Sequence, residues 1–266
     1  MKRFFAAVLS VCLLLTSCRS IKSDTDVPDA FGTEAETEEV SPKFERDTDG
    51  KLVVMIDAGH GFDDVGCTSQ YIDCYEKDIN LQVSLKLKAK LEEKGVTVIL
   101  THDGETFVDE DELAAECKSL GISFKEEGVT NNDNFYAYER ALLAQVKDKR
   151  EGVDLFISLH VNALESEDVS GYQVFYCTDN PERKRVKALC EDIADSLDNK
   201  CDVVGYPAED AYIVTKFGTF PSLLFEMGYA TNQNDAKKLV DNEFQNSLAD
   251  LLALKIYSFV LSAAEK

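Results

Sequence analysis

The chain has 266 residues, 44% of them hydrophobic, and its 50 acidic and 28 basic residues give a formal net charge of −22. Once a leader and a polar tether are set aside, about two hundred residues remain, which suits one globular domain. The negative charge argues against nucleic acid or anionic lipid headgroups as surface partners, because both attract basic patches. The same charge also fits a role in solubility alone.

The N-terminus has the pattern of a secretory leader. Two basic residues precede an apolar run that ends at Leu15, and this run is too short to span a bilayer. The segment that follows, LTSC, resembles the lipobox of bacterial lipoproteins, in which the leader is cut before a cysteine that carries lipid. We therefore predict a signal peptide at residues 1–17, a lipidated Cys18, and an exported, membrane-anchored lipoprotein that faces the cell wall or periplasm. An ordinary secreted protein cut nearby is the alternative.

Residues 18–50 are predicted to form an acidic tether between Cys18 and the globular domain at residues 51–266. They are rich in Ser, Thr, Asp, Glu and Pro and contain few large apolar side chains. Such a segment cannot offset the entropy that ordering costs, so we predict that it is disordered. A flexible chain of this length reaches roughly 30 Å, which would hold the globular domain off a membrane.

The cysteines leave the redox state of the domain open. The chain has eight, and six remain if Cys12 leaves with the leader and Cys18 carries lipid. An even number in an oxidising compartment permits disulfides. Cys67 and Cys74 are the one pair that we name as a candidate, and two buried free thiols are the alternative.

The globular part begins with a predicted strand and a predicted helix. Residues 52–56 form a continuous apolar run before the segment DAGHG, as expected for a buried strand that opens into a glycine-rich loop. Residues 76–94 alternate apolar and polar side chains, which by itself indicates a strand. The segment is too long for a strand and consists mainly of helix formers, so we predict a helix that ends before Gly95.

The remaining elements predict an α/β fold. Strands are expected at residues 96–100, 154–159, 172–177 and 222–225, and helices at residues 136–146, 183–197 and 244–261. Because strands and helices alternate, we expect parallel βαβ units. The predicted fold is a single domain with a mostly parallel, twisted sheet of about six strands and helices on both faces.

Two of the three histidines, His60 and His160, follow predicted buried strands. Neutral imidazole is a preferred zinc ligand, and catalytic zinc sites commonly combine three protein ligands with one open position. A single histidine at the end of a strand is more often structural, so these residues taken one at a time indicate little.

Four segments, in order along the chain, resemble the zinc-dependent N-acetylmuramoyl-L-alanine amidases with the type 3 catalytic domain. They are IDAGHGFDDVG, in which His60 matches the first metal ligand; YEKDINLQVSLKLKAKLEEKGVTVILT, in which Glu76 matches the second; DLFISLHVNA, in which His160 matches the third; and PSLLFEMGYATNQND, in which Glu226 matches the catalytic glutamate. The chain departs from the family pattern at Phe62, Val65 and His102, where the family usually has Gly, Pro and Arg. None of these departures removes a ligand.

The resemblance implies hydrolysis of the amide bond between N-acetylmuramic acid and L-alanine in peptidoglycan. Zinc would polarise the carbonyl and lower the pKa of its bound water to about 7, and Glu226 would carry a proton to the leaving nitrogen. Asp57 and Asn162 are candidates for orienting an imidazole or the substrate, with loop hydrogen bonding as the alternative. A zinc peptidase acting within the stem peptide and a wall-binding lipoprotein without turnover are the alternative functions.

An acidic insert at residues 106–133 makes the connection before Arg140 longer than is usual in the family. Leu113, Cys117 and Leu120 fall at helical spacing, with acidic residues in the first turn and Gly121 after the end, so a short helix is expected there. We hypothesise that this segment gates the metal site, as an acidic side chain near the metal or as an apolar face filling the substrate groove, until the wall or a regulatory protein displaces it. A solvated surface decoration is the alternative.

Overall fold

The computed structural model describes residues 50–106, 108–123, 132–216 and 218–264. All of these belong to one compact unit, residues 42–266. The predicted signal peptide, Cys18 and nearly all of the predicted tether lie outside the described residues.

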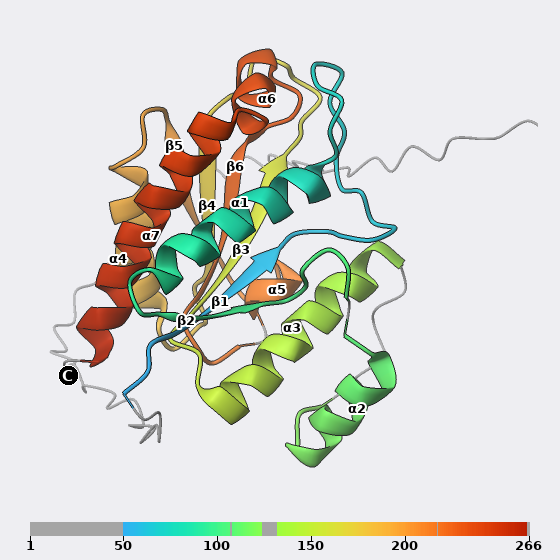
Figure 1. Ribbon diagram of the computed structural model, residues 1–266, viewed down its shortest axis with the longest axis vertical. Coiled ribbons are helices and arrows are strands. Elements are labelled where there is room, and N and C mark those ends of the chain that lie inside the picture. Colours follow the sequence, from blue (N-terminus) through green and yellow to red (C-terminus); the bar gives the residue numbers. More distant parts are fainter. Residues whose placement is uncertain (1–49, 107, 124–131, 217, 265–266) are drawn as a thin grey trace, which may run out of the picture. The chain divides into compact units, whose positions relative to one another are not determined.

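A six-stranded sheet forms the centre of the domain, with the strand order β2-β1-β3-β6-β4-β5 (Figure 1). All neighbouring strands run parallel except β4 and β6, which are antiparallel. This arrangement confirms the predicted fold class. The strands are β1 Val53–Ala58, β2 Thr97–Leu100, β3 Leu155–Asn162, β4 Tyr172–Cys177, β5 Cys201–Tyr206 and β6 Ser222–Tyr229.

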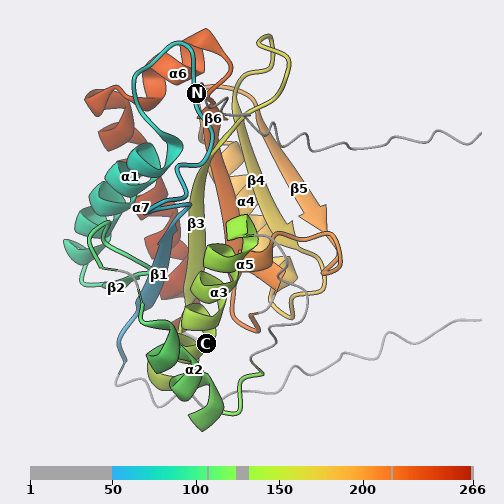
Figure 2. The same ribbon diagram turned by 90° about the vertical axis from the view of Figure 1, so that its right-hand side faces the viewer.

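Helices cover both faces of the sheet, and alternate residues of one strand contribute to two different cores. Val54 and Ile56 of β1 belong to the core that also contains residues of α1, α4 and α7, whereas Met55 belongs to the core that contains residues of α2, α3 and α5. Figure 2 shows α1 and α7 on one side of the sheet and α3 on the other. The helices are α1 Glu76–Glu92, α2 Glu110–Ser119, α3 Asn132–Glu151, α4 Arg183–Ala194, α5 Ile213–Lys216, α6 Gln233–Leu239 and α7 Asn242–Ala264.

Helix α1 confirms the helix predicted there in spite of the alternating apolar and polar side chains. Its fully buried apolar residues follow one another at four-residue steps, as helical geometry requires, whereas Leu85 is 44% exposed. The apolar residues at the other alternate positions therefore point away from the core and gave a misleading strand signal. The buried apolar residues are Ile79, Val83, Leu87 and Leu91.

Several elements differ from the sequence-based expectation. Strand β6 continues to Tyr229, so Glu226 lies within the strand rather than at its end, and His160 likewise lies within β3. Strand β5 and the short helices α5 and α6 were not anticipated. Strand β5 pairs only with β4 at the edge of the sheet and its residues are half-buried or exposed, so it lacks the apolar run that marks an interior strand.

The predicted helix in the acidic insert is present as α2. The side chain of Asp109 caps it by accepting a hydrogen bond from the backbone N–H of Glu112. Leu113 and Cys117 are buried in the core shared with α3. The apolar face of α2 is therefore used in packing, and the version of the gate hypothesis in which this face fills the substrate groove is wrong. Residues 124–131 of the insert lie outside the described part.

The pairing of Cys67 with Cys74 is also wrong, because both are free thiols. The Cys67 thiol donates a hydrogen bond of 3.4 Å to the carbonyl of Val161, and the Cys74 thiol lies 3.7 Å from the carbonyl of Tyr75. The two sulfur atoms are thus directed at different backbone groups. Both cysteines are half-buried.

Candidate metal centre and active site

The structure brings His60, Glu76 and His160 together. One ligand atom from each lies within 4.8 Å of the other two. His60 follows β1, Glu76 begins α1, and His160 lies near the C-terminal end of β3. The Nε2 atom of His60 is 3.2 Å from Glu76 Oε1, and the Nδ1 atom of His160 is 3.1 Å from the same oxygen. The C-terminal edge of a parallel sheet is where such residues are expected to converge.

The loop that presents His60 has an unusual backbone. His60, Gly61 and Phe62 have φ angles of 64°, 134° and 53°, a left-handed run that disfavours residues with a side chain. The Phe62 ring lies 5.6 Å from the ring of His102, whose Nε2 donates a 2.8 Å hydrogen bond to the carbonyl of Ala58. The rings at two of the departures from the family pattern therefore contact each other.

Two glycines allow the three side chains to approach one another. A Cβ atom at Gly59 would overlap the ring of His160. A Cβ atom at Gly66 would lie 2.6 Å from Glu76 Oε2 and 2.8 Å from His60 Cδ2, and this glycine also has a φ of +68°. Any larger residue at either position would displace a candidate ligand.

Asp64 and Asn80 hold two of the candidate ligands, and the sequence analysis missed both. His60 Nδ1 donates a 2.8 Å hydrogen bond to Asp64 Oδ2, which leaves Nε2 directed at Glu76. The side chain of Asn80 donates to the carbonyl of Gly59 at 3.0 Å and to Glu76 Oε1 at 3.3 Å. The sequence signals were spacings of four residues, from His60 to Asp64 and from Glu76 to Asn80.

Backbone groups complete the support of Glu76. The N–H of Cys67 donates to Oε2 at 2.7 Å, and the N–H of Val161 donates to Oε1 at 3.0 Å. The carboxylate is thus fixed by the loop after β1 and by β3 at the same time. Each oxygen accepts from a rigid donor, so its position depends little on side-chain rotamers.

The electrostatics of this centre favour a positive charge. Burial alone would lower the pKa of His60, but its hydrogen bonds to Asp64 and Glu76 raise that pKa to about 10. Burial would raise the pKa of Glu76, yet hydrogen bonds to His160 and His60 hold it well below its ordinary value. The carboxylates of Asp64 and Glu76 therefore favour a positive charge on the His60 imidazole.

Glu226 lies directly beside this cluster. The sheet register pairs it with His160 on the neighbouring strand, and its side chain is only 7% exposed. Its Oε2 atom has no hydrogen-bond partner within the described part of the chain. Burial, with a further contribution from the charge of Glu76, raises the pKa of Glu226 well above its ordinary value. The site thus combines three candidate metal ligands with one further carboxylate, that of Glu226, whose Oε2 accepts no hydrogen bond from the described residues.

Asp57 and Asn162 make different contacts. The fully buried carboxylate of Asp57 lies 2.7 Å from Arg140 Nε and accepts hydrogen bonds of 2.7 Å from Thr101 and Ser158. These partners tie the sheet to α3, which fits the structural interpretation of Asp57. Asn162 instead donates a 2.7 Å hydrogen bond to Gln173 Oε1 on β4.

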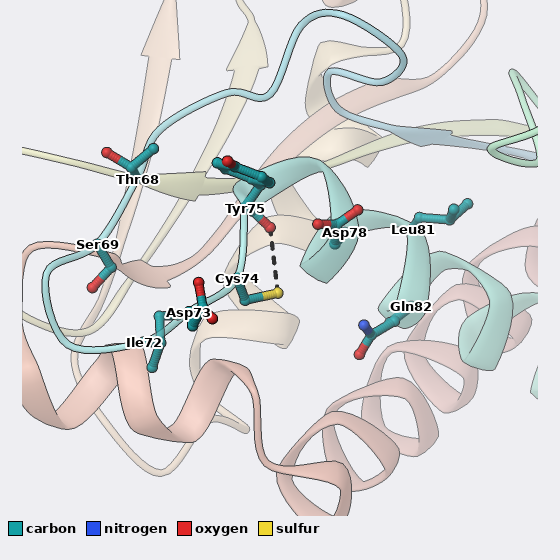
Figure 3. Close-up of a pocket in the computed structure, with 9 residues that line it drawn as sticks. All are labelled: Thr68, Ser69, Ile72, Asp73, Cys74, Tyr75, Asp78, Leu81 and Gln82. Atoms are coloured by element: carbon teal, nitrogen blue, oxygen red, sulfur yellow. Dashed lines mark hydrogen bonds between the residues drawn. The ribbon is translucent and has the colours of Figure 1, made fainter.

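A pocket of about 470 Å³ opens beside the first turns of α1. Figure 3 shows Tyr75, Asp78 and Gln82 of this region along one wall and the loop with Ser69 and Asp73 along another. None of the three candidate ligands lines it. The pocket therefore flanks the metal centre rather than forming it.

Comparison with known proteins places these features in one family. The N-acetylmuramoyl-L-alanine amidase family matches residues 54–258. The chain is 29% identical to the uncharacterized protein YqiI of Bacillus subtilis, covering 79% of this chain and 85% of that protein. It is 27% identical to the germination-specific N-acetylmuramoyl-L-alanine amidase of the same organism, covering 79% and 78%. The CwlD amidase of Clostridioides difficile, solved in complex with the GerS lipoprotein, superposes with a TM-score of 0.59 and 27% identity, covering 80% of this chain and all of that one.

Proposed function

The chain belongs to the N-acetylmuramoyl-L-alanine amidase family, and on that premise we propose that it hydrolyses the amide bond between N-acetylmuramic acid and L-alanine in peptidoglycan with the help of a zinc ion. The proposal rests on one observation. Potential ligand atoms of His60, Glu76 and His160 lie within 4.8 Å of one another, beside the buried carboxylate of Glu226.

The donor set fits zinc. Two imidazole nitrogens and one carboxylate oxygen are a common catalytic ligand set for this ion, and three protein ligands leave a position for water or substrate. Asp64 supports the set by fixing the orientation of the His60 ring. When bound, zinc supplies a Lewis acid for the scissile carbonyl oxygen and for the attacking water.

Glu226 is the proton carrier in this proposal. Its raised pKa suits a carboxylate that accepts a proton from water and then passes it on. The oxygen of that water bonds to the carbonyl carbon as the C–N bond breaks, and the proton carried by Glu226 goes to the departing nitrogen. The products are a free lactyl carboxylate on the glycan and a free L-alanine amino group. Glu76 is less suited to this task, because its two oxygens already accept from Cys67 and Val161.

Digestion of purified peptidoglycan tests the function directly. The soluble domain, residues 51–266, should release stem peptides that begin with a free L-alanine amino terminus, as read by mass spectrometry. A zinc peptidase acting within the stem peptide would expose a different amino terminus. A wall-binding protein without turnover would release nothing, although it would still sediment with the wall.

We further propose the export and anchoring arrangement that the sequence indicates. Residues 1–17 act as a signal peptide, Cys18 carries lipid, and residues 18–50 tether the catalytic domain, residues 51–266, on the outer side of a membrane. A regulatory protein would act on the insert at residues 106–133. The structure of the Clostridioides difficile amidase with a lipoprotein supports the idea that enzymes of this fold take protein partners.

A further inference from the structure

Gln173 shares the catalytic face of the sheet with Glu226 and His160. Strand β6 lies between β3 and β4 (Figure 1), and its Glu226 is paired with His160 on one side and with Gln173 on the other. Residues directly opposite one another in a ladder point to the same face. The three side chains therefore form one row, with the proton carrier in the middle.

A hydrogen bond across β6 fixes the orientation of Gln173. Asn162 Nδ2 on β3 donates to Gln173 Oε1 on β4 at 2.7 Å. Because this bond uses the oxygen of the glutamine amide, the two hydrogens of Nε2 are directed away from Asn162. Gln173 and Asn162 are both half-buried, so the amide pair borders the site without being sealed inside the core.

We propose that Gln173 binds an amide group of the substrate next to the scissile bond, and that Asn162 positions Gln173 for this contact. The inference rests on the proposed function. A muramoyl peptide carries amide groups on both sides of the bond to be cut, in the acetamido group and in the stem peptide. A fixed amide donor recognises an amide carbonyl in an orientation-dependent way, and orientation next to the proton carrier is what the reaction requires. Gln173 is thus a substrate-contacting residue and Asn162 a positioning residue.

A binding experiment tests this without depending on turnover. A soluble N-acetylmuramoyl peptide is titrated calorimetrically into zinc-loaded protein with Glu226→Gln, which should cut it too slowly to disturb the titration. Adding Gln173→Met should weaken binding about tenfold, as expected for one oriented hydrogen bond. Adding Asn162→Ala alone should weaken binding less. In the Gln173→Met background Asn162→Ala should have no further effect, because the residue acts through Gln173.

Two controls separate recognition from folding. Gln145 is also half-buried, but its side chain bonds to its own helix at the carbonyl of Ala141, so Gln145→Met should leave the dissociation constant unchanged. If Gln173→Met fails to fold, Gln173→Glu keeps the acceptor for Asn162 and removes both donors, and it should show the same loss. Zinc content should be equal in all variants.

The inference is overturned if the folded Gln173 variants bind the peptide as tightly as their parent, or if the parent does not bind it at all. If the losses of binding affinity from the Asn162 and Gln173 substitutions were additive, Asn162 would have no positioning role. Failure of the proposed function looks different: the unmodified, zinc-loaded enzyme would release no L-alanine amino termini from peptidoglycan, whatever the binding result.

Discussion

Asp64 accepts a hydrogen bond from His60 at 2.8 Å and also accepts one from the backbone N–H of Gly66 at 3.1 Å. The Asp64 carboxylate thereby orients the His60 ring and also holds the backbone of the loop on which His60 lies. We expect Asp64→Asn to weaken zinc binding about 10- to 100-fold, as measured by competition with a chelator. The exposed neighbour Asp63 provides the matched control, and Asp63→Asn should leave zinc affinity unchanged. Equal affinities in both variants would show that the Asp64 contact has no role in metal binding.

Substitutions should distinguish the candidate metal ligands from Glu226 by their effects on zinc content and on turnover. His60→Ala and His160→Ala should lose the single zinc ion that we expect per chain. Glu226→Gln should keep it but lose about 10²- to 10⁴-fold in turnover, because the amide preserves shape and removes the basic oxygen. Metal analysis of the purified proteins and peptidoglycan digestion provide the two measurements. Full zinc loading in the histidine variants would contradict the ligand assignment, and wild-type turnover in Glu226→Gln would contradict the proton-carrier assignment.

Gly59→Ala should damage the metal centre more than the fold. The added methyl group would overlap the His160 ring, so that ring must move away from its partners. We expect lower zinc affinity with a retained circular dichroism spectrum. Gly95→Ala is a useful comparison, because its Cβ atom meets nothing within 4 Å although its φ of +82° is unfavourable; it should lower stability and leave zinc binding intact. Unchanged zinc binding in Gly59→Ala would mean that the loop relaxes.

Glu139 should make stability depend on pH. It is buried, its two carboxylate oxygens lack hydrogen-bond partners among the described residues, and burial and the nearby charge of Glu110 raise its pKa to about 7 despite Arg140. Because the folded state holds this proton more tightly than the unfolded state, stability is highest below the unfolded pKa and falls as the pH rises through 7.

Glu139→Gln should remove this loss of stability at higher pH, because the amide does not ionise. Urea unfolding should show the variant more stable than the unmodified protein by about 1–3 kcal/mol at pH 8, with the gain disappearing near pH 4. Glu151→Gln, at the exposed end of the same helix, should shift stability little at either pH. A gain that is the same at both pH values would rule out the titration of Glu139 as its cause.

Cys18→Ser tests the anchor. We expect the variant to leave the membrane fraction while the released protein digests peptidoglycan at the normal rate, because the catalytic domain does not depend on the lipid. Fractionation followed by immunoblotting, with the unmodified protein in parallel, gives the result. Continued membrane association of the variant would count against lipidation at this residue.

The sequence was sufficient to predict the sheet and the grouping of His60, Glu76 and His160, because both depend on strong local patterns. Apolar runs mark β1 and β3, and four ordered segments identified His60, Glu76, His160 and Glu226. It was not sufficient for residues whose role depends on folding. Asp64 reaches His60 only because the loop between them turns through left-handed conformations.

The pairing of residues on neighbouring strands could not be predicted from the sequence either. Gln173 is distant in sequence from Glu226 and lies beside it through the register of β4 and β6. The edge strand β5 lacks a buried apolar run, and the spacing of Cys67 and Cys74 said nothing about where their thiols point. Each omission concerns geometry that periodicity and composition do not encode.

The contact between Phe62 and His102 couples two positions that differ from the usual Gly and Arg of the family. A phenylalanine in the left-handed region costs about 1 kcal/mol, and a ring contact returns a comparable amount. We therefore expect the two positions to be energetically coupled, so that restoring only one of the usual family residues should lower stability more than restoring both.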